Sequence, residues 1–164
     1  MMFDFNLQDA LQTTAPTVSR GRFDPEEVTI ERGNLDHLEQ MLRHRLAIDP
    51  DRLSAYFALY KLLFRQSRLE EAANTALLAI AVSARLGRFS AVWQKLTPDV
   101  ADWADTQSPA HFYLFTMKAL SFIRLRQGQI EDCRSLLAKI QELDPNDLVG
   151  ASVIRSYADG ADPQ

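Results

Sequence analysis

Residues 51–87 read DRLSAYFALYKLLFRQSRLEEAANTALLAIAVSARLG and hold the clearest periodic pattern in the chain. No Gly or Pro occurs from Asp51 to Leu86, and apolar residues recur at spacings of three and four. In the first half this apolar face consists of Tyr56, Leu59, Tyr60 and Leu63. The spacing predicts a helix that ends close to Ser67.

After Arg68 the pattern restarts in a second phase. Its face is formed by Leu69, Ala72, Ala73, Ala76, Leu77 and Ile80. Small residues on a helix face allow a neighbouring helix to approach closely. We therefore expect a hairpin of two antiparallel helices, with Ala72 and Ala76 buried where the helices meet.

The same pattern recurs upstream at an offset of 34 residues. The matched positions are Leu35 with Leu69, Leu38 with Ala72, Ile48 with Val82, and Gly33 with Ser67. A shared offset indicates a structural repeat. It predicts a short helix at residues 25–32 capped by Asp24, a turn at Gly33 and a partner helix at residues 34–48 that stops before Pro50.

Downstream, residues 88–107 interrupt the repeat. We expect two short helices there, the second capped by Thr97, after a long helix that ends with Gly87 as its C′ residue. The regular pattern resumes at Ser108 with a helix to about Gln127, a turn at Gly128 and a partner helix over residues 130–143. Asn146 or Asp147 would cap a last helix at residues 148–158, which closes the stack.

The expected domain organisation is one all-α unit between two tails. Residues 1–24 form an N-terminal tail, which is mobile, laid over the body or carries a short docking helix; residues 25–158 form the repeat domain; residues 159–164 form a disordered tail. With 164 residues, 46% of them hydrophobic, the chain is long enough for one continuous core. Its single Cys excludes an internal disulfide.

The N-terminus has neither the basic region nor the apolar region of a signal peptide, and no apolar run approaches membrane-spanning length. These features predict a cytoplasmic protein. The net charge of −4 argues against nucleic acid as the main partner.

The sequence contains no set of residues typical of an active site. A phosphate-binding glycine loop, an HExxH motif, paired CxxC motifs and a nucleophile elbow are all missing from it. We therefore expect no enzymatic activity and no cofactor. His37 and His44 could share a helix face and hold a metal, but two histidines without a third ligand are more typical of a polar surface. Cys133 falls at a small, buried position of the repeat, which favours a packed thiol over a reactive one.

Charge is segregated along the chain. Residues 52–69 contain four basic side chains and no acid, and residues 106–130 contain three basic side chains and no acid. The acids gather in the second helices, as at Glu70 and Glu131, and in the interrupting segment, as at Asp99.

The order Tyr56, Leu59-Tyr60, Leu63, Ala72, Ala76, Ala79 resembles the tetratricopeptide repeat (TPR). Two departures are that Tyr60 replaces a small residue and Ala76 replaces a large one, an exchange of volume across the seam. The resemblance implies an all-α, TPR-like solenoid of antiparallel helical hairpins with a C-terminal capping helix. It also implies that the first helix of each pair lines a concave groove. The groove positions would be Ser54, Phe57, Lys61, Phe64 and Arg65, followed by Phe115, Lys118, Phe122 and Arg126.

Such a groove would suit a protein partner with an acidic and apolar contact surface. The alternative is that the basic residues are ordinary solvated positions and the phenylalanines belong to the core. A nucleic-acid ligand fits less well, because two short basic stripes with acidic neighbours make a poor phosphate track.

The runs DRLSAYFALYKLLFRQSRLEEA and FYLFTMKALSFIRLRQG, with LDPNDLVGASVI after the second, resemble small TPR-like proteins encoded among bacterial nitrogen-fixation genes. This resemblance implies an accessory factor, an adaptor or a protective assembly chaperone, that binds nitrogenase or a component of its assembly machinery. Two other classes stay open: a type III secretion chaperone, which also uses about three TPR-like units, and a small enzyme.

Overall fold

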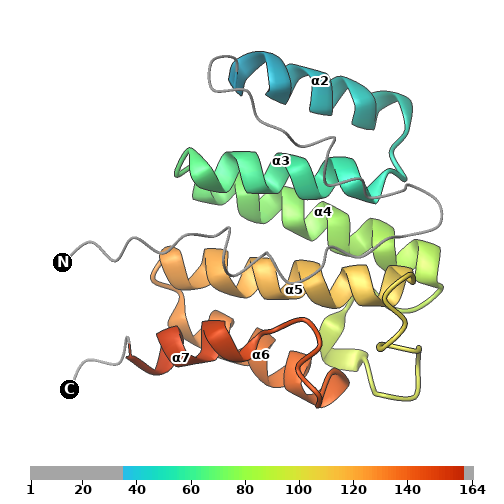
Figure 1. Ribbon diagram of the computed structural model, residues 1–164, viewed down its shortest axis with the longest axis vertical. Coiled ribbons are helices and arrows are strands. Elements are labelled where there is room, and N and C mark those ends of the chain that lie inside the picture. The colour runs from blue at the N-terminus through green and yellow to red at the C-terminus, as the bar shows by residue number, and fades with distance from the viewer. Residues whose placement is uncertain (1–34, 161–164) are drawn as a thin grey trace.

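The computed structural model describes residues 35–160 (Figure 1). Its elements are α2 (Leu35–Ile48), α3 (Leu53–Arg65), α4 (Leu69–Gly87), the 3-10 helix η2 (Trp93–Lys95), α5 (Pro109–Arg126), α6 (Ile130–Leu143) and α7 (Ser152–Gly160). Residues 35–160 contain no β-strand, so the prediction of an all-α protein is confirmed for this range. The expected helix at 25–32, the turn at Gly33 and the tail at 1–24 lie outside the described residues.

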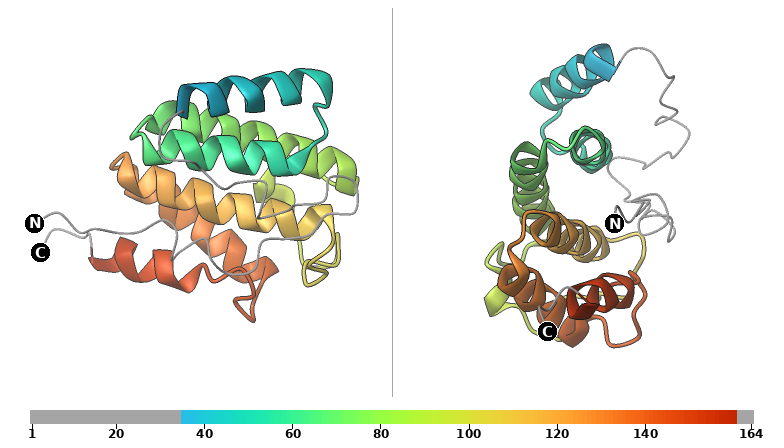
Figure 2. Two further views of the ribbon diagram at one scale, coloured as in Figure 1. Left: turned by 45° about the horizontal axis from the view of Figure 1, so that its top comes forward. Right: turned by 90° about the vertical axis from the view of Figure 1, so that its left-hand side faces the viewer.

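The helices form a stack of two layers. α3 packs against α4, α4 against α5, and α5 against α6, while α2 contacts α3 and α7 contacts both α5 and α6. Figure 2 shows α3, α5 and α7 on one side of the stack and α4 and α6 on the other. α2 lies at one end, against α3.

The seam between α3 and α4 is built from small side chains on one helix and large ones on the other. Ala72 and Ala76 are 0% exposed, as expected. They share the core with Tyr60 and Leu63 of α3. The alanines allow the two helices to approach closely while the α3 side chains fill the space between them.

Of the three predicted interhelix turns, the two that lie within residues 35–160, at Ser67 and Gly128, are confirmed. Ser67 has φ 58° and Gly128 has φ 77°, so both adopt the left-handed conformation. Their backbone bonds match as well. The N–H of Ser67 bonds to Phe64 O at 2.9 Å and the N–H of Gly128 bonds to Leu125 O at 3.0 Å. The two hairpins therefore turn in the same way.

Residues 88–108 differ from the expectation of two short helices, because only η2 forms there. α4 ends at Gly87, and Arg88 takes the left-handed conformation expected of Gly87. A Cβ atom at Gly87 would lie 2.2 Å from the Phe89 ring, which folds back over the helix end. The Phe89 ring packs edge-on against Trp103 and Tyr113. These aromatic contacts, in place of helical hydrogen bonds, fix the segment between α4 and α5 to the core.

Thr97 does not cap a helix; its hydroxyl donates to Asp99 instead. The last helix also begins later than expected, at Ser152. Asp144 accepts hydrogen bonds from the N–H groups of Leu148 and Val149, which draws this stretch into a turn. Asp147 then accepts from the Ser152 N–H. No helix of residues 35–160 combines the length and apolarity needed to cross a bilayer.

Candidate protein-binding surface

α3 and α5 lie side by side and bring together the residues predicted to line a groove. The Phe57 and Phe115 rings are 5.6 Å apart, and the Phe64 and Phe122 rings are 5.2 Å apart, between centroids. In both pairs the two residues are 58 positions apart in the sequence, and the second pair lies seven residues further along each helix than the first. The result is an aromatic ladder between the two hairpins.

A cation stands over three of these rings. Lys61 Nζ lies 5.8 Å from the Phe57 centroid, and Lys118 Nζ lies 5.7 Å from that of Phe115. The guanidinium of Arg126 lies 5.6 Å from the Phe64 centroid. Each distance is within the range of cation–π attraction. Sequence position alone places Lys61 and Lys118 next to their rings on the same helix, but the contact of Arg126 with Phe64 joins α5 to α3.

The rings are buried, which corrects the expectation of an open aromatic surface. The four rings are between 1% and 7% exposed, and Ser54 is 8% exposed. The physical reason is that each ring packs against a ring of the neighbouring helix. For the phenylalanines, the interpretation as core residues therefore fits the structure, and a role in partner binding stays a prediction.

Lys118 is also buried, at 1% exposed, and differs from the solvated groove cation that was expected. Its Nζ donates a hydrogen bond of 2.8 Å to the carbonyl of Val149. Burial lowers the pKa of Lys118 to about 8, against a smaller opposing effect of Asp147. The side chain therefore ties α5 to the turn before α7.

The accessible charge on this side comes from Lys61, Arg65 and Arg126, which we call the cationic cluster. Lys61 is half-buried, whereas Arg65 and Arg126 are exposed. Burial, together with the charge of Arg65, lowers the pKa of Lys61. None of the three forms an ion pair with a carboxylate of residues 35–160.

Several other cations of the described chain pair with carboxylates. Arg85 pairs with Asp51, Arg134 with Glu131, and Lys139 with Glu142. Arg88 and Lys95, which are exposed, also form no ion pair with a carboxylate of residues 35–160. The cationic cluster differs from them in that its three charges lie on two helices that pack side by side.

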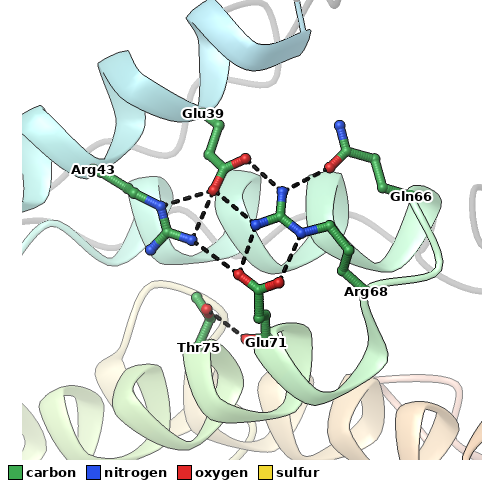
Figure 3. A network of polar contacts seen from close by, with 6 residues as sticks. All are labelled: Glu39, Arg43, Gln66, Arg68, Glu71 and Thr75. Carbon is green, nitrogen blue, oxygen red and sulfur yellow. Dashed lines mark hydrogen bonds and ion pairs between the residues drawn. The ribbon is translucent and has the colours of Figure 1, made fainter.

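The most extensive ion-pair network centres on Arg68 (Figure 3). Arg68 Nη1 lies 2.6 Å from Glu39 Oε2, and its Nη2 lies 2.6 Å from Glu71 Oε2. Arg43 of α2 approaches both carboxylates. The hydrogen bond from Arg68 lowers the pKa of Glu39. Sequence reasoning placed Arg68 in a basic stripe and missed this role, because Glu39 stands 29 residues away and only the spacing to Glu71 gave a local signal.

A recess opens on the other side of the stack, between α4, η2, α5 and α6. Its volume is about 470 Å³. The lining consists of Leu77, Trp93, Gln94, Leu120, Arg124, Asp132, Ser135 and Leu136. Two exposed apolar residues lie near this lining in the sequence: Leu78 belongs to α4, and Val92 directly precedes η2. From the sequence, residues 88–107 are an alternative place for the main partner contact, beside the groove and the N-terminal tail, and this stays a prediction.

The histidines and the cysteine offer little chemistry. Within residues 35–160 no group of three or more His, Cys, Asp or Glu residues could hold a metal ion. Cys133 is 0% exposed, and burial raises the pKa of its thiol to about 11. Its position agrees with the expected packed thiol.

The chain is similar to an uncharacterized 19.8 kDa protein in the nifW 5′ region of Azotobacter chroococcum mcd 1. The two are 28% identical over 118 residues, which cover 71% of this chain and 66% of that protein. The matched part thus spans just under two thirds of the relative. No protein-family model matches the chain, and no solved structure matches it.

Proposed function

We propose that this protein is a non-catalytic, divergent TPR-like adaptor or assembly chaperone, which binds a partner protein through the α3–α5 side of its stack. Two hairpins with the same turn geometry, followed by the closing helix α7, support a repeat architecture. Proteins of this architecture offer extended surfaces to other proteins.

The observation that carries the proposal is the cationic cluster. Lys61, Arg65 and Arg126 lie on neighbouring helices and form no ion pair with a carboxylate of residues 35–160, although the repulsion of like charges is unfavourable for the isolated molecule. An acidic partner surface would relieve this repulsion and would also be steered towards it. We therefore expect a partner whose contact surface is acidic with apolar anchors.

The relative in the nifW region supports a role associated with nitrogen fixation, because genes of one process are often neighbours in bacteria. On this basis the partner we propose is a nitrogenase component or a protein that assembles nitrogenase. The interaction is expected in the cytoplasm.

The test compares three full-length proteins as bait. These are the wild type, the double variant Lys61→Glu/Arg65→Glu, and the control Arg88→Glu/Lys95→Glu, which makes the same charge change at two exposed positions after α4. Each is immobilised and exposed to extract from cells grown with and without fixed nitrogen. We expect one protein to be retained by the wild type and the control, chiefly from nitrogen-fixing cells, and to be lost with the cluster variant.

The captured protein is then titrated against all three baits at low and high salt. Reversing the charges at Lys61 and Arg65 should weaken partner binding at least tenfold at low salt. The difference from wild type should be smaller at high salt, because salt screens charges separated by more than ~3 to 10 Å. Circular dichroism checks that each variant is folded. Equal affinity of the cluster variant and the wild type would contradict the proposal, and selective loss in the control would place binding beside η2.

A further inference from the structure

The side of α3 and α5 that carries the cationic cluster has no described helix over it. α3 packs mainly against α2, α4 and α5, and α5 packs mainly against α3, α4, α6 and α7. In the right-hand view of Figure 2, no helix of residues 35–160 forms a third layer beyond α3 and α5. An additional segment could therefore lie along this side without displacing any helix of the stack.

The chemistry of this side defines what would bind there. Arg65 and Arg126 are the last residues of α3 and α5, so two of the three charges stand at neighbouring helix ends. The rings of Phe57 and Phe64 lie beneath Lys61 and Arg126. Because these rings are almost entirely buried, a matching segment is recognised mainly by carboxylates that face the cations.

The beginning of this chain has that composition. Residues 3–11 read FDFNLQDAL, with acids at Asp4 and Asp9, and the first basic residue of the chain is Arg20. The apolar residues Phe3, Leu7 and Leu11 recur every four positions, a spacing that places them on one face of a helix. The segment therefore offers an apolar stripe and two negative charges.

The connection is long enough. Leu35 opens α2, which packs on α3. The 23 residues from 12 to 34 could span up to about 75 Å at ~3.3 Å per residue. α3, with 13 residues, is only about 20 Å long at 1.5 Å per residue. A tether of this length gives an effective concentration on the order of millimolar, so even weak contacts would be populated.

We propose that residues 3–11 bind to the cationic cluster of the same molecule, with Asp4 and Asp9 facing Lys61, Arg65 and Arg126. The contact covers the α3–α5 side until a partner displaces it. If the partner binds the cationic cluster as proposed above, residues 3–11 compete with the acidic surface of the partner, and this regulatory role rests on the proposed function. The intramolecular contact itself does not depend on any partner.

The first experiment tests the contact in the purified wild-type chain. A water-soluble carbodiimide joins a carboxylate to an amine when the two touch, and Lys61 is the lysine of the cluster. After coupling at low protein concentration and trypsin digestion, we expect peptide 1–20, which holds Asp4 and Asp9, joined to peptide 53–65, which holds Lys61. The yield should fall at high salt, and exposed Lys95 serves as the internal control, for which no link to peptide 1–20 is expected.

Mixing ordinary and nitrogen-15-labelled chains distinguishes links within one molecule from links between two. A link that forms within single chains supports the proposal. Absence of the 1–20 to 53–65 link, an equal link to Lys95, or links only in mixed pairs would overturn it, the last result pointing to a second copy as the occupant.

The second experiment tests competition with the partner protein identified above. Asp4→Lys/Asp9→Lys should release the segment, and Glu26→Lys/Glu27→Lys is the control with the same charge change outside it. If the segment covers the cluster nine-tenths of the time, release should tighten partner binding about tenfold. Unchanged affinity would overturn the competition.

The two proposals can fail separately. If the intramolecular link is missing but the cluster variant loses the partner, the docking of residues 3–11 is wrong and the proposed function stands. If the link forms but the cluster variant keeps its partner, residues 3–11 dock as proposed and the partner-binding surface lies elsewhere.

Discussion

Lys118 is a predicted groove residue that becomes buried when the helices pack. Its ammonium group is buried and hydrogen-bonded to the carbonyl of Val149, with the Phe115 ring beside it. Burying a charge is unfavourable, so folding favours the neutral amine and lowers the pKa of Lys118 from 10.5 to about 8.

This shift predicts an unusual pH dependence of stability. Between pH 8 and 10.5 the unfolded chain holds the Lys118 proton more tightly than the folded chain, so this residue makes the free energy of unfolding rise with pH. The contribution approaches about 1 kcal/mol per pH unit. Urea denaturation from about pH 7.5 to 9.5 should show a flatter profile for Lys118→Met than for the wild type. Lys95→Met, at an exposed position, should keep the wild-type profile. Parallel profiles for wild type and Lys118→Met would contradict the assignment.

Ala72 tests the packing of the α3–α4 seam. Because this side chain is 0% exposed, Ala72→Leu should force larger atoms between the helices and lower the free energy of unfolding by ~1 to 3 kcal/mol. Ala81→Leu introduces the same side chain at an exposed position of the same helix and should have little effect. Thermal melts of the two variants give the comparison, and equal midpoints would mean that the seam tolerates the added volume.

Residue positions were predictable from the sequence where local spacing determines them. Ala72, Ala76 and Cys133 are buried because they fall on the apolar face of their helices, and this face follows from the 3.6-residue period. The burial of Lys118 was not predictable in this way. Its environment depends on Val149, 31 residues later, and no local pattern reports such a distance.

At the scale of elements, α2 is held differently from the other helices. None of its residues is buried, and its apolar contacts to the core come from the partly buried Leu42 and Leu46. The Arg68 network supplies a polar attachment between α2 and the start of α4. α2 should therefore open more easily than the rest of the stack.

Removing that attachment should loosen α2 locally. In Arg68→Met, hydrogen exchange of the α2 amides should become faster, while the amides of α4 and α5 keep their protection. The effect on the thermal midpoint should be small, because exposed ion pairs contribute ~0 to 1 kcal/mol. Arg65→Met, three residues earlier and without an ion pair within residues 35–160, is the matched control.

The pH dependence of α2 gives an independent check. Since Arg68 lowers the pKa of Glu39, the attachment is fully present above the ordinary glutamate value and is lost as the pH falls through the lowered value. The intrinsic exchange rate slows as the pH falls through this range, so the comparison is made as protection relative to that rate. Protection of the α2 amides should decrease in acid, and only when Arg68 is present. Uniform behaviour of wild type and Arg68→Met in acid would contradict this account.

Most element boundaries followed from the sequence, and the largest difference lies between α4 and α5. Turns at Ser67 and Gly128 have local signals on both sides. In residues 88–108 the apolar residues were interpreted as helical faces, but Phe89 and Trp103 are anchors of an irregular segment. Three-dimensional aromatic packing replaced helical hydrogen bonds there, and single-sequence periodicity does not distinguish these two uses of an aromatic residue.

At the scale of the whole molecule, the aromatic ladder joins the two hairpins. Phe122 is 2% exposed and faces Phe64 across the α3–α5 boundary. Phe122→Ala should therefore lower the free energy of unfolding by ~3 to 5 kcal/mol. Because the ladder couples both hairpins, circular dichroism and tryptophan fluorescence should report one common transition. Leu78→Ala, at a position 58% exposed, should change little. Two separate transitions in Phe122→Ala would mean that the hairpins unfold independently.

The sequence predicted which helices would pair but not how closely the α3–α5 side would close. A repeat pattern places Phe57 and Phe115 at corresponding faces of successive units, where a groove is usual. Their burial arises from contact between units, which depends on the relative placement of α3 and α5. Lys61, Arg65 and Arg126 lie on α3 and α5, the two helices in which the sequence shows basic residues and no acid, and their role in partner binding stays a prediction.

The hydrogen bond from Lys118 to Val149 also bears on how a cell distinguishes finished from unfinished chains. A polypeptide released early from the ribosome, before Val149, would contain all of α5 but lack the carbonyl that accepts from its buried ammonium group. Such a chain would also lack α7, whose buried Ile154 and Ala158 belong to the core, so it would lose apolar burial together with the acceptor. Chains stopped at residue 147 should therefore be cleared by proteases much faster than complete ones, and pulse-chase labelling would measure the difference. Stable folding of the preceding helices therefore depends on residues near the end of the described chain.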